Sequence, residues 1–136
     1  MSFQLREHTA DVAVEATGDS LDETFAAVAD GLTAAMCDEW PDSGDRFSVD
    51  IDAENVEALL FDYLDQLIYE RDVRLVLPVD NQATVQERAG EWHLAGSARG
   101  VPLSDVNARD IKAVTYSDMT VEETDDGWRA YVVLDV

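Results

Sequence analysis

The fold is decided by residues 55–72, which read NVEALLFDYLDQLIYERD. Apolar side chains recur in this stretch with the period of an α-helix and form one wide stripe. Such a stripe must be buried against other elements, because it would otherwise expose a continuous apolar surface to water. We therefore expect a helix from about residue 55 to residue 72 that packs against a sheet. The stripe consists of Val56, Leu59, Leu60, Tyr63, Leu64, Leu67 and Ile68.

A second amphipathic helix is predicted over residues 20–37. Ser20 followed three residues later by Glu23 matches a capping box, in which the two side chains satisfy free backbone N–H groups at the start of a helix. The apolar positions that follow have helical spacing. They are Leu21, Phe25, Val28, Leu32 and Met36.

About seven further segments have the alternation or composition of β-strands, and short turns join most of them as hairpins. Turns at Gly90 and at Asp125-Asp126-Gly127 predict two of these hairpins. The expected fold is α+β, a two-layer sandwich with two main helices packed on a largely antiparallel or mixed sheet of about seven strands. No repeat or linker divides the chain, so residues 1–136 are expected to form one domain. The strand segments are 11–17, 46–52, 74–77, 83–88, 92–98, 111–123 and 128–136.

The chain is strongly acidic, with 30 Asp and Glu against 9 Lys and Arg and a net charge of −21. Many carboxylates with a single lysine, Lys112, are typical of a protein from a salt-rich cytoplasm, where high ionic strength screens their repulsion. We therefore expect a halophilic source. Phosphate backbones are repelled by such a surface, so no direct nucleic-acid binding is expected. No apolar run is long enough to span a membrane and residues 1–8 do not resemble a signal peptide, which predicts a cytoplasmic protein without membrane association.

Sequence motifs of common enzymes are missing: there is no phosphate-binding loop, no GxSxG elbow and no HExxH metal motif. The single cysteine, Cys37, falls on or near the apolar stripe of the first helix and is expected in the core. The tryptophans Trp40, Trp92 and Trp128 are expected in the core or at its rim. No catalytic residue is assigned, and the balance favours a binding or accessory role.

Two polar places stand apart from this background. His8-Thr9-Ala10-Asp11-Val12 leads into a buried strand, and Leu134-Asp135-Val136 places an acid beside the last carboxylate of the sequence. If the first and last strands are neighbours, then Asp11, Asp135 and the terminal carboxylate of Val136 could share one divalent cation, because such cations prefer several oxygen donors. The alternative is that both aspartates are ordinary solvated acids.

These places and three other segments resemble the archease family. The combination extends over the whole length and is specific, whereas one segment alone would be a weak signal. The segments are HTADV at 8–12, SLDETFAAVADGL at 20–32, VEALLFDYLDQLIY at 56–69, IKAVTYSDM at 111–119, and Trp128 through Val136.

The resemblance implies an accessory protein that assists the RtcB-type RNA ligase in tRNA splicing and RNA repair. That ligase joins a 3′-phosphate or 2′,3′-cyclic phosphate end to a 5′-hydroxyl through a GMP attached to a ligase histidine. The family's protein promotes guanylylation and multiple turnover of the ligase without joining RNA itself.

The resemblance also implies a divalent metal ion, calcium or else magnesium or manganese, held by Asp11, Asp135 and Val136. His8 and Lys112 are the predicted partner contacts. Ser117 departs from the family, because many members have a histidine after the VTY segment.

Two other functions stay open at this point. One is a stand-alone metal-dependent phosphatase or nuclease with Asp11 and Asp135 as ligands and His8 as general base. Few groups that could bind phosphate and no recognisable catalytic constellation argue against it. The other is a chaperone-like module that recognises RNA-processing proteins in general.

Overall fold

The structure is a computed structural model that describes residues 2–8 and 11–136, apart from the side chains of residues 6–8. Within these residues the chain forms two helices and seven strands, joined by short connections and by two longer segments, residues 37–44 and residues 106–112. In chain order the elements are β1 (Ser2–His8), β2 (Asp11–Gly18), α1 (Leu21–Met36), β3 (Asp45–Ala53), α2 (Val56–Arg74), β4 (Val76–Arg88), β5 (Glu91–Pro102), the 3₁₀ turn η1 (Leu103–Asp105), β6 (Ala113–Thr124) and β7 (Gly127–Asp135).

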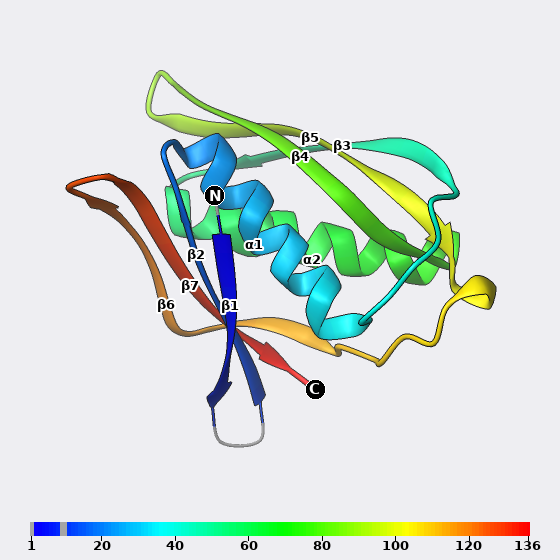
Figure 1. Cartoon of the computed structure of the whole chain (residues 1–136). Helices are drawn as coiled ribbons and strands as arrows, with labels where there is room; N and C mark the ends of the chain where they lie inside the picture. The colour runs from blue at the N-terminus through cyan, green and yellow to red at the C-terminus, as the bar shows by residue number, and fades with distance from the viewer. Residues whose placement is uncertain (1, 9–10) are drawn as a thin grey trace.

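The strands form two antiparallel sheets, with the orders β1-β2-β7-β6 and β3-β5-β4. Both helices lie between the sheets (Figure 1). The first helix, α1, contacts β1, β2 and β7 on one side and β4 on the other, while α2 contacts β6 on one side and the three-stranded sheet on the other. Each helix therefore buries apolar side chains against both sheets, and the hydrophobic core lies along the helices.

The predicted α+β class, with two main helices packed on seven strands, is confirmed. The strands are divided between two sheets, although a single sheet was expected. The number of strands agrees with the prediction, but two of the strands differ from the predicted segments. The first strand, β1, was not predicted, and the segments 74–77 and 83–88 belong to one long strand, β4. That strand is interrupted by a bulge, where the register shifts between Val79 and Gln82 and Asp80 adopts φ 50°.

The start of α1 follows the predicted capping box, and the start of α2 has a cap that was not predicted. Ser20 Oγ accepts the Glu23 N–H at 3.2 Å, and Glu23 Oε2 accepts the Asp19 N–H at 3.0 Å. At the start of α2, Asn55 Oδ1 accepts the Ala58 N–H at 2.8 Å. The wide stripe of α2 faces the core, as predicted, because its central leucines and Tyr63 are fully buried. No helix in the described part of the chain is both long and apolar enough to cross a membrane.

A buried polar network fastens α1 to the bulge of β4. Asp30 Oδ1 accepts hydrogen bonds from the Asn81 backbone N–H at 3.2 Å and from Asn81 Nδ2 at 2.9 Å. The same Nδ2 lies 3.3 Å from Thr33 Oγ1, whose hydroxyl donates to the Pro78 carbonyl at 2.5 Å. Burial raises the pKa of Asp30, although its bonds to Asn81 oppose that effect. The network fixes how the helix sits on the three-stranded sheet.

We expect Asn81→Ala to lower the free energy of unfolding by about 1–3 kcal/mol, because it removes the amide donor to Asp30 and Thr33 inside the protein. Urea unfolding followed by circular dichroism measures this change. Gln82→Ala is the matched control, because Gln82 is the exposed neighbour in the same strand. An equal loss in both variants would show that the network adds nothing beyond local strand propensity.

Candidate functional site

The pairing of β2 with β7 brings the two predicted polar places to one end of the four-stranded sheet, where β2 begins and β7 finishes. This end of the sheet, with Asp11, Asp135 and Val136, is here called the candidate metal edge. Val12 pairs with Leu134 in an antiparallel register, and extending this register by one residue sets Asp11 opposite Asp135. On the other side of β7, the Lys112 backbone N–H donates to the Asp135 carbonyl at 2.8 Å. In Figure 1 the C-terminal end of β7 lies beside this end of the sheet. The structure thus brings Asp11, Asp135 and Lys112 together, which their positions in the sequence do not show.

The sheet edge offers hard oxygen donors. Asp11 is half-buried and Asp135 is exposed, and Val136 follows at 42% exposure. Two carboxylates and the carboxylate of Val136 fit a divalent cation that prefers oxygen ligands. Among the side chains that the structure describes, no three His, Cys, Asp or Glu groups converge as a metal-ligand set. The predicted set contains only two such side chains, and the metal site stays a prediction.

The two predicted partner contacts also belong to this edge. His8 is the last residue of β1, and its backbone pairs with Asp11. Its side chain lies outside the part that the structure describes, as do Thr9 and Ala10 entirely. Lys112 is exposed and comes directly before β6.

The segment that leads into Lys112 is held by a buried arginine. Arg71 of α2 is only 6% exposed, and its Nη1 donates to the Ile111 carbonyl at 3.1 Å. Its Nη2 forms ion pairs with Asp72 at 2.9 Å and with Asp110 at 3.2 Å. A buried guanidinium needs such partners, because desolvation of an unpaired charge is costly. Arg71 therefore positions the chain next to the candidate metal edge.

We expect Arg71→Lys to lower the free energy of unfolding by about 2 kcal/mol or more, because an ammonium cannot reproduce the planar fork that joins Ile111 and two carboxylates. Arg74→Lys is the control on the same helix. Arg74 is half-exposed, pairs with Glu70 at 2.9 Å and lies over the Phe47 ring, so its replacement should cost about 1 kcal/mol or less. Chemical denaturation of both variants decides the matter, and equal losses would refute a special role for Arg71.

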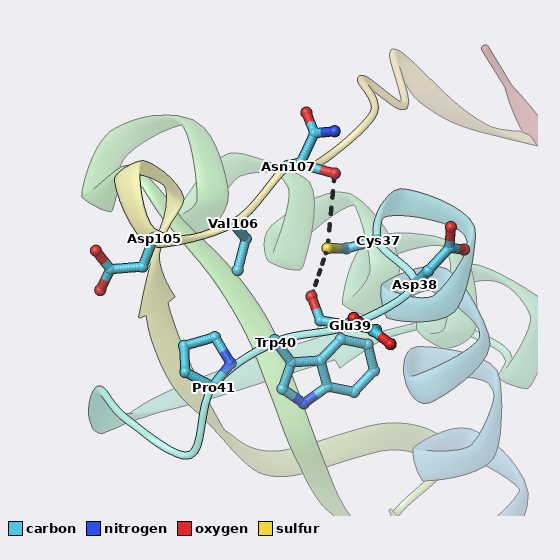
Figure 2. A pocket seen from close by; sticks show the side chains of 8 residues that line it. All are labelled: Cys37, Asp38, Glu39, Trp40, Pro41, Asp105, Val106 and Asn107. Carbon is cyan, nitrogen blue, oxygen red and sulfur yellow. Dashed lines mark hydrogen bonds between the residues drawn. The ribbon is translucent and has the colours of Figure 1, made fainter.

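A second feature is a pocket of about 620 Å³ at the C-terminal end of α1 (Figure 2). It is built from two segments that are distant in the sequence, the end of α1 with the loop after it and the turn that follows β5. Figure 2 shows Trp40 and Pro41 along one wall, with Asp105 across the pocket from Asp38. The lining residues are Cys37, Asp38, Glu39, Trp40, Pro41, Asp105, Val106 and Asn107.

The two segments of the pocket are joined by hydrogen bonds at its back. Cys37 is buried, as predicted, with 2% of its surface exposed. Its Sγ lies 3.0 Å from the Glu39 carbonyl oxygen and 3.8 Å from the Asn107 carbonyl oxygen, and the thiol can donate to either (Figure 2). The Arg109 backbone N–H donates to the Met36 carbonyl at 2.6 Å. Trp40 is 36% exposed, so it is a rim residue. The sequence pattern did not reveal the pocket, because no periodicity connects the loop after α1 to residues 105–107.

Tyr116, in the VTY segment of β6, makes an exposed aromatic contact with α2. Tyr116 stacks on Phe61 of α2, with ring centroids 4.2 Å apart and planes within 6°. Its pKa is raised, by desolvation first and by the charge of Asp62 second. Ser117 follows in the irregular part of β6, exposed to solvent, with its N–H donating to Thr115 Oγ1 at 3.2 Å.

A model of the archease protein family matches residues 3–136. The "Protein archease" of Pyrococcus furiosus is 31% identical, covering 96% of this chain and 95% of the relative. That of Methanosarcina acetivorans is 33% identical, with coverages of 98% and 95%.

Two solved structures have the same fold. A Methanobacterium thermoautotrophicum protein solved in solution matches with a TM-score of 0.86 and 28% identity over 98% of both chains. A Thermotoga maritima archease, described as a possible chaperone, matches with a TM-score of 0.63 and 22% identity over 98% of this chain and 96% of its own. At that identity the second match concerns the fold alone.

Proposed function

The chain belongs to the archease family, and from this premise we propose that it is a metal-binding accessory protein that activates an RtcB-type RNA ligase. In this role it promotes guanylylation and repeated turnover of the ligase in tRNA splicing and RNA repair, and it joins no RNA itself. The observation that supports the proposal is the β2–β7 pairing, whose register, extended by one residue beyond Val12 and Leu134, sets Asp11 opposite Asp135.

The ligand set is Asp11, Asp135 and Val136. Carboxylates on neighbouring strands bring two negative charges together, and a divalent cation would offset their repulsion. When bound, calcium, magnesium or manganese supplies a compact positive charge at an otherwise anionic edge. The chain's own contribution is to hold the donors in place. The Lys112 N–H binds the Asp135 carbonyl, Asp11 pairs with His8 of β1, and Asp135 pairs with Ala113 of β6.

The charge of the chain supports a protein partner over RNA as the direct ligand. A net charge of −21 disfavours approach to phosphate backbones and favours approach to a basic protein surface. Lys112 and His8 are the predicted partner contacts. Lys112 is the single lysine and lies exposed at the metal edge, where it could meet an anionic group of the ligase.

We expect Asp11→Ala and Asp135→Ala each to abolish stimulation of the ligase while the fold is retained, because neither side chain is part of the hydrophobic core. The measurement is formation of the ligase–GMP adduct and multiple-turnover RNA joining at molar salt, with circular dichroism as the check on folding. Asp126→Ala in the exposed β6–β7 turn is the matched control and should stimulate like the wild type.

The double variant should be no worse than either single one, because groups that act through one shared site are non-additive. Full stimulation by both single variants would refute the assignment of the site. Failure of the wild-type protein to stimulate any ligase step would refute the proposed function itself.

A further inference from the structure

The loop between α1 and β3 already binds two guanidinium groups of its own chain. At one end, Arg109 Nη2 pairs with Asp38 at 2.9 Å. At the other end, Arg99 donates from Nη1 to the Pro41 carbonyl at 3.2 Å and to the Ser43 carbonyl, and its Nη2 lies 3.5 Å from Asp42. Carboxylate and carbonyl oxygens of this loop thus already accept hydrogen bonds from planar guanidinium N–H donors.

The same loop lines the 620 Å³ pocket, where three groups make no contact with any arginine side chain that the structure describes. Glu39 and Asp105 form no ion pair or side-chain hydrogen bond with any residue that the structure describes. Trp40 presents a partly exposed indole on the wall (Figure 2). Tryptophan is the strongest cation–π acceptor among the aromatic side chains, and nearby carboxylates strengthen the attraction for a cation.

The walls of the pocket are already fixed before any ligand arrives. The Cys37 thiol bridges toward Glu39 and Asn107, and the Val106 N–H donates to the Leu103 carbonyl at 3.3 Å. Such preorganisation lowers the entropy cost of binding. The site therefore combines a preformed pocket, an aromatic platform, the uncommitted Glu39 carboxylate on the same side as Trp40, and two neighbouring examples of the same recognition chemistry, while Asp105 adds negative charge at the opposite rim (Figure 2).

We propose that this pocket binds an arginine side chain of a protein partner. An arginine fits better than a lysine, because a guanidinium is more weakly hydrated, stacks on an indole face and donates in a planar fork to carbonyl and carboxylate oxygens. A second copy of this chain is a poor occupant, because both copies carry a charge of −21. The inference rests on the proposed accessory function only in assigning the arginine to a protein.

The test uses three short peptides, acetyl-Gly-Arg-Gly-amide and its lysine and glutamine counterparts, with the full-length protein at 1 M salt. Nuclear magnetic resonance follows the three indole N–H signals, and Trp40→Phe identifies the one that belongs to Trp40. We expect the arginine peptide to shift the Trp40 signal and to leave those of Trp92 and Trp128 in place. The lysine peptide should bind more weakly and the glutamine peptide should not bind. High salt suppresses non-specific attraction to the acidic surface.

Variants of the lining residues test the contacts separately. Glu39→Gln should weaken arginine-peptide binding about two- to fivefold, as expected for an exposed charge pair, and Asp105→Asn should weaken it less, because the Asp105 carboxylate points away from Trp40 (Figure 2). Trp40→Leu should weaken it about as much as Glu39→Gln does, while Trp40→Phe should retain more of the affinity. The matched controls are Glu123→Gln and Asp126→Asn, two exposed acids at the β6–β7 hairpin, and they should change binding less than the lining variants do.

The proposal is overturned if the arginine peptide leaves the Trp40 signal unchanged, if the control variants weaken binding as much as the lining variants, or if the lysine peptide binds equally well. These readouts need no ligase. Peptide binding without ligase stimulation would refute the proposed function and support the pocket, whereas stimulation without peptide binding would refute the pocket alone.

Discussion

The antiparallel pairing of β2 with β7 is the interaction on which the rest of the structure depends. It joins the second strand of the chain to the last one, with Val14 opposite Val132 and Ala16 opposite Ala130. All four side chains are buried, and they form part of the surface on which α1 packs. On the same pair of strands, Arg129 binds Glu15 at 2.6 Å. Closing a loop of this length is entropically costly, so the buried ladder must compensate for it.

This pairing also decides where the polar ends of the strands meet. The residue before Val12 and the residue after Leu134 are both aspartates, and the register sets them at one edge. The segment before β6 then connects this edge to the pocket at the end of α1. Arg71 holds one end of that segment through Ile111, and the Arg109 backbone holds the middle through Met36. The candidate metal edge and the candidate arginine pocket are therefore two ends of one anchored segment.

The helices could be predicted from the sequence because their signals are local. Capping by Ser20 at the first helix and the apolar period of both helices depend only on neighbouring residues. The strands were harder to predict. The edge strand β1 leaves Phe3 and Leu5 partly exposed, so no buried face marks it clearly. In β4, the bulge at Asp80 breaks the alternation and splits one strand into two predicted pieces.

Long-range arrangement accounts for what the sequence did not reveal. Alternation shows that a strand has one buried face, but it does not show which sheet the strand joins. The division of the strands into two sheets could therefore not be predicted from alternation. The aspartates of the candidate metal edge were identified from their positions at the ends of strands and from the family resemblance. The pocket was missed, because Trp40 and Asp105 line one pocket only after the loop that follows α1 and the turn that follows β5 are in place.

The most direct measurement of the central claim is a manganese titration of the isotope-labelled protein followed by nuclear magnetic resonance. Bound Mn²⁺ broadens the signals of nearby nuclei, so the amides that disappear first identify the site. A shared site at the β2–β7 edge predicts that Asp11, Lys112, Asp135 and Val136 broaden together at substoichiometric metal in molar salt. Broadening spread evenly over the acidic surface, or confined to residues 38–45, would contradict it.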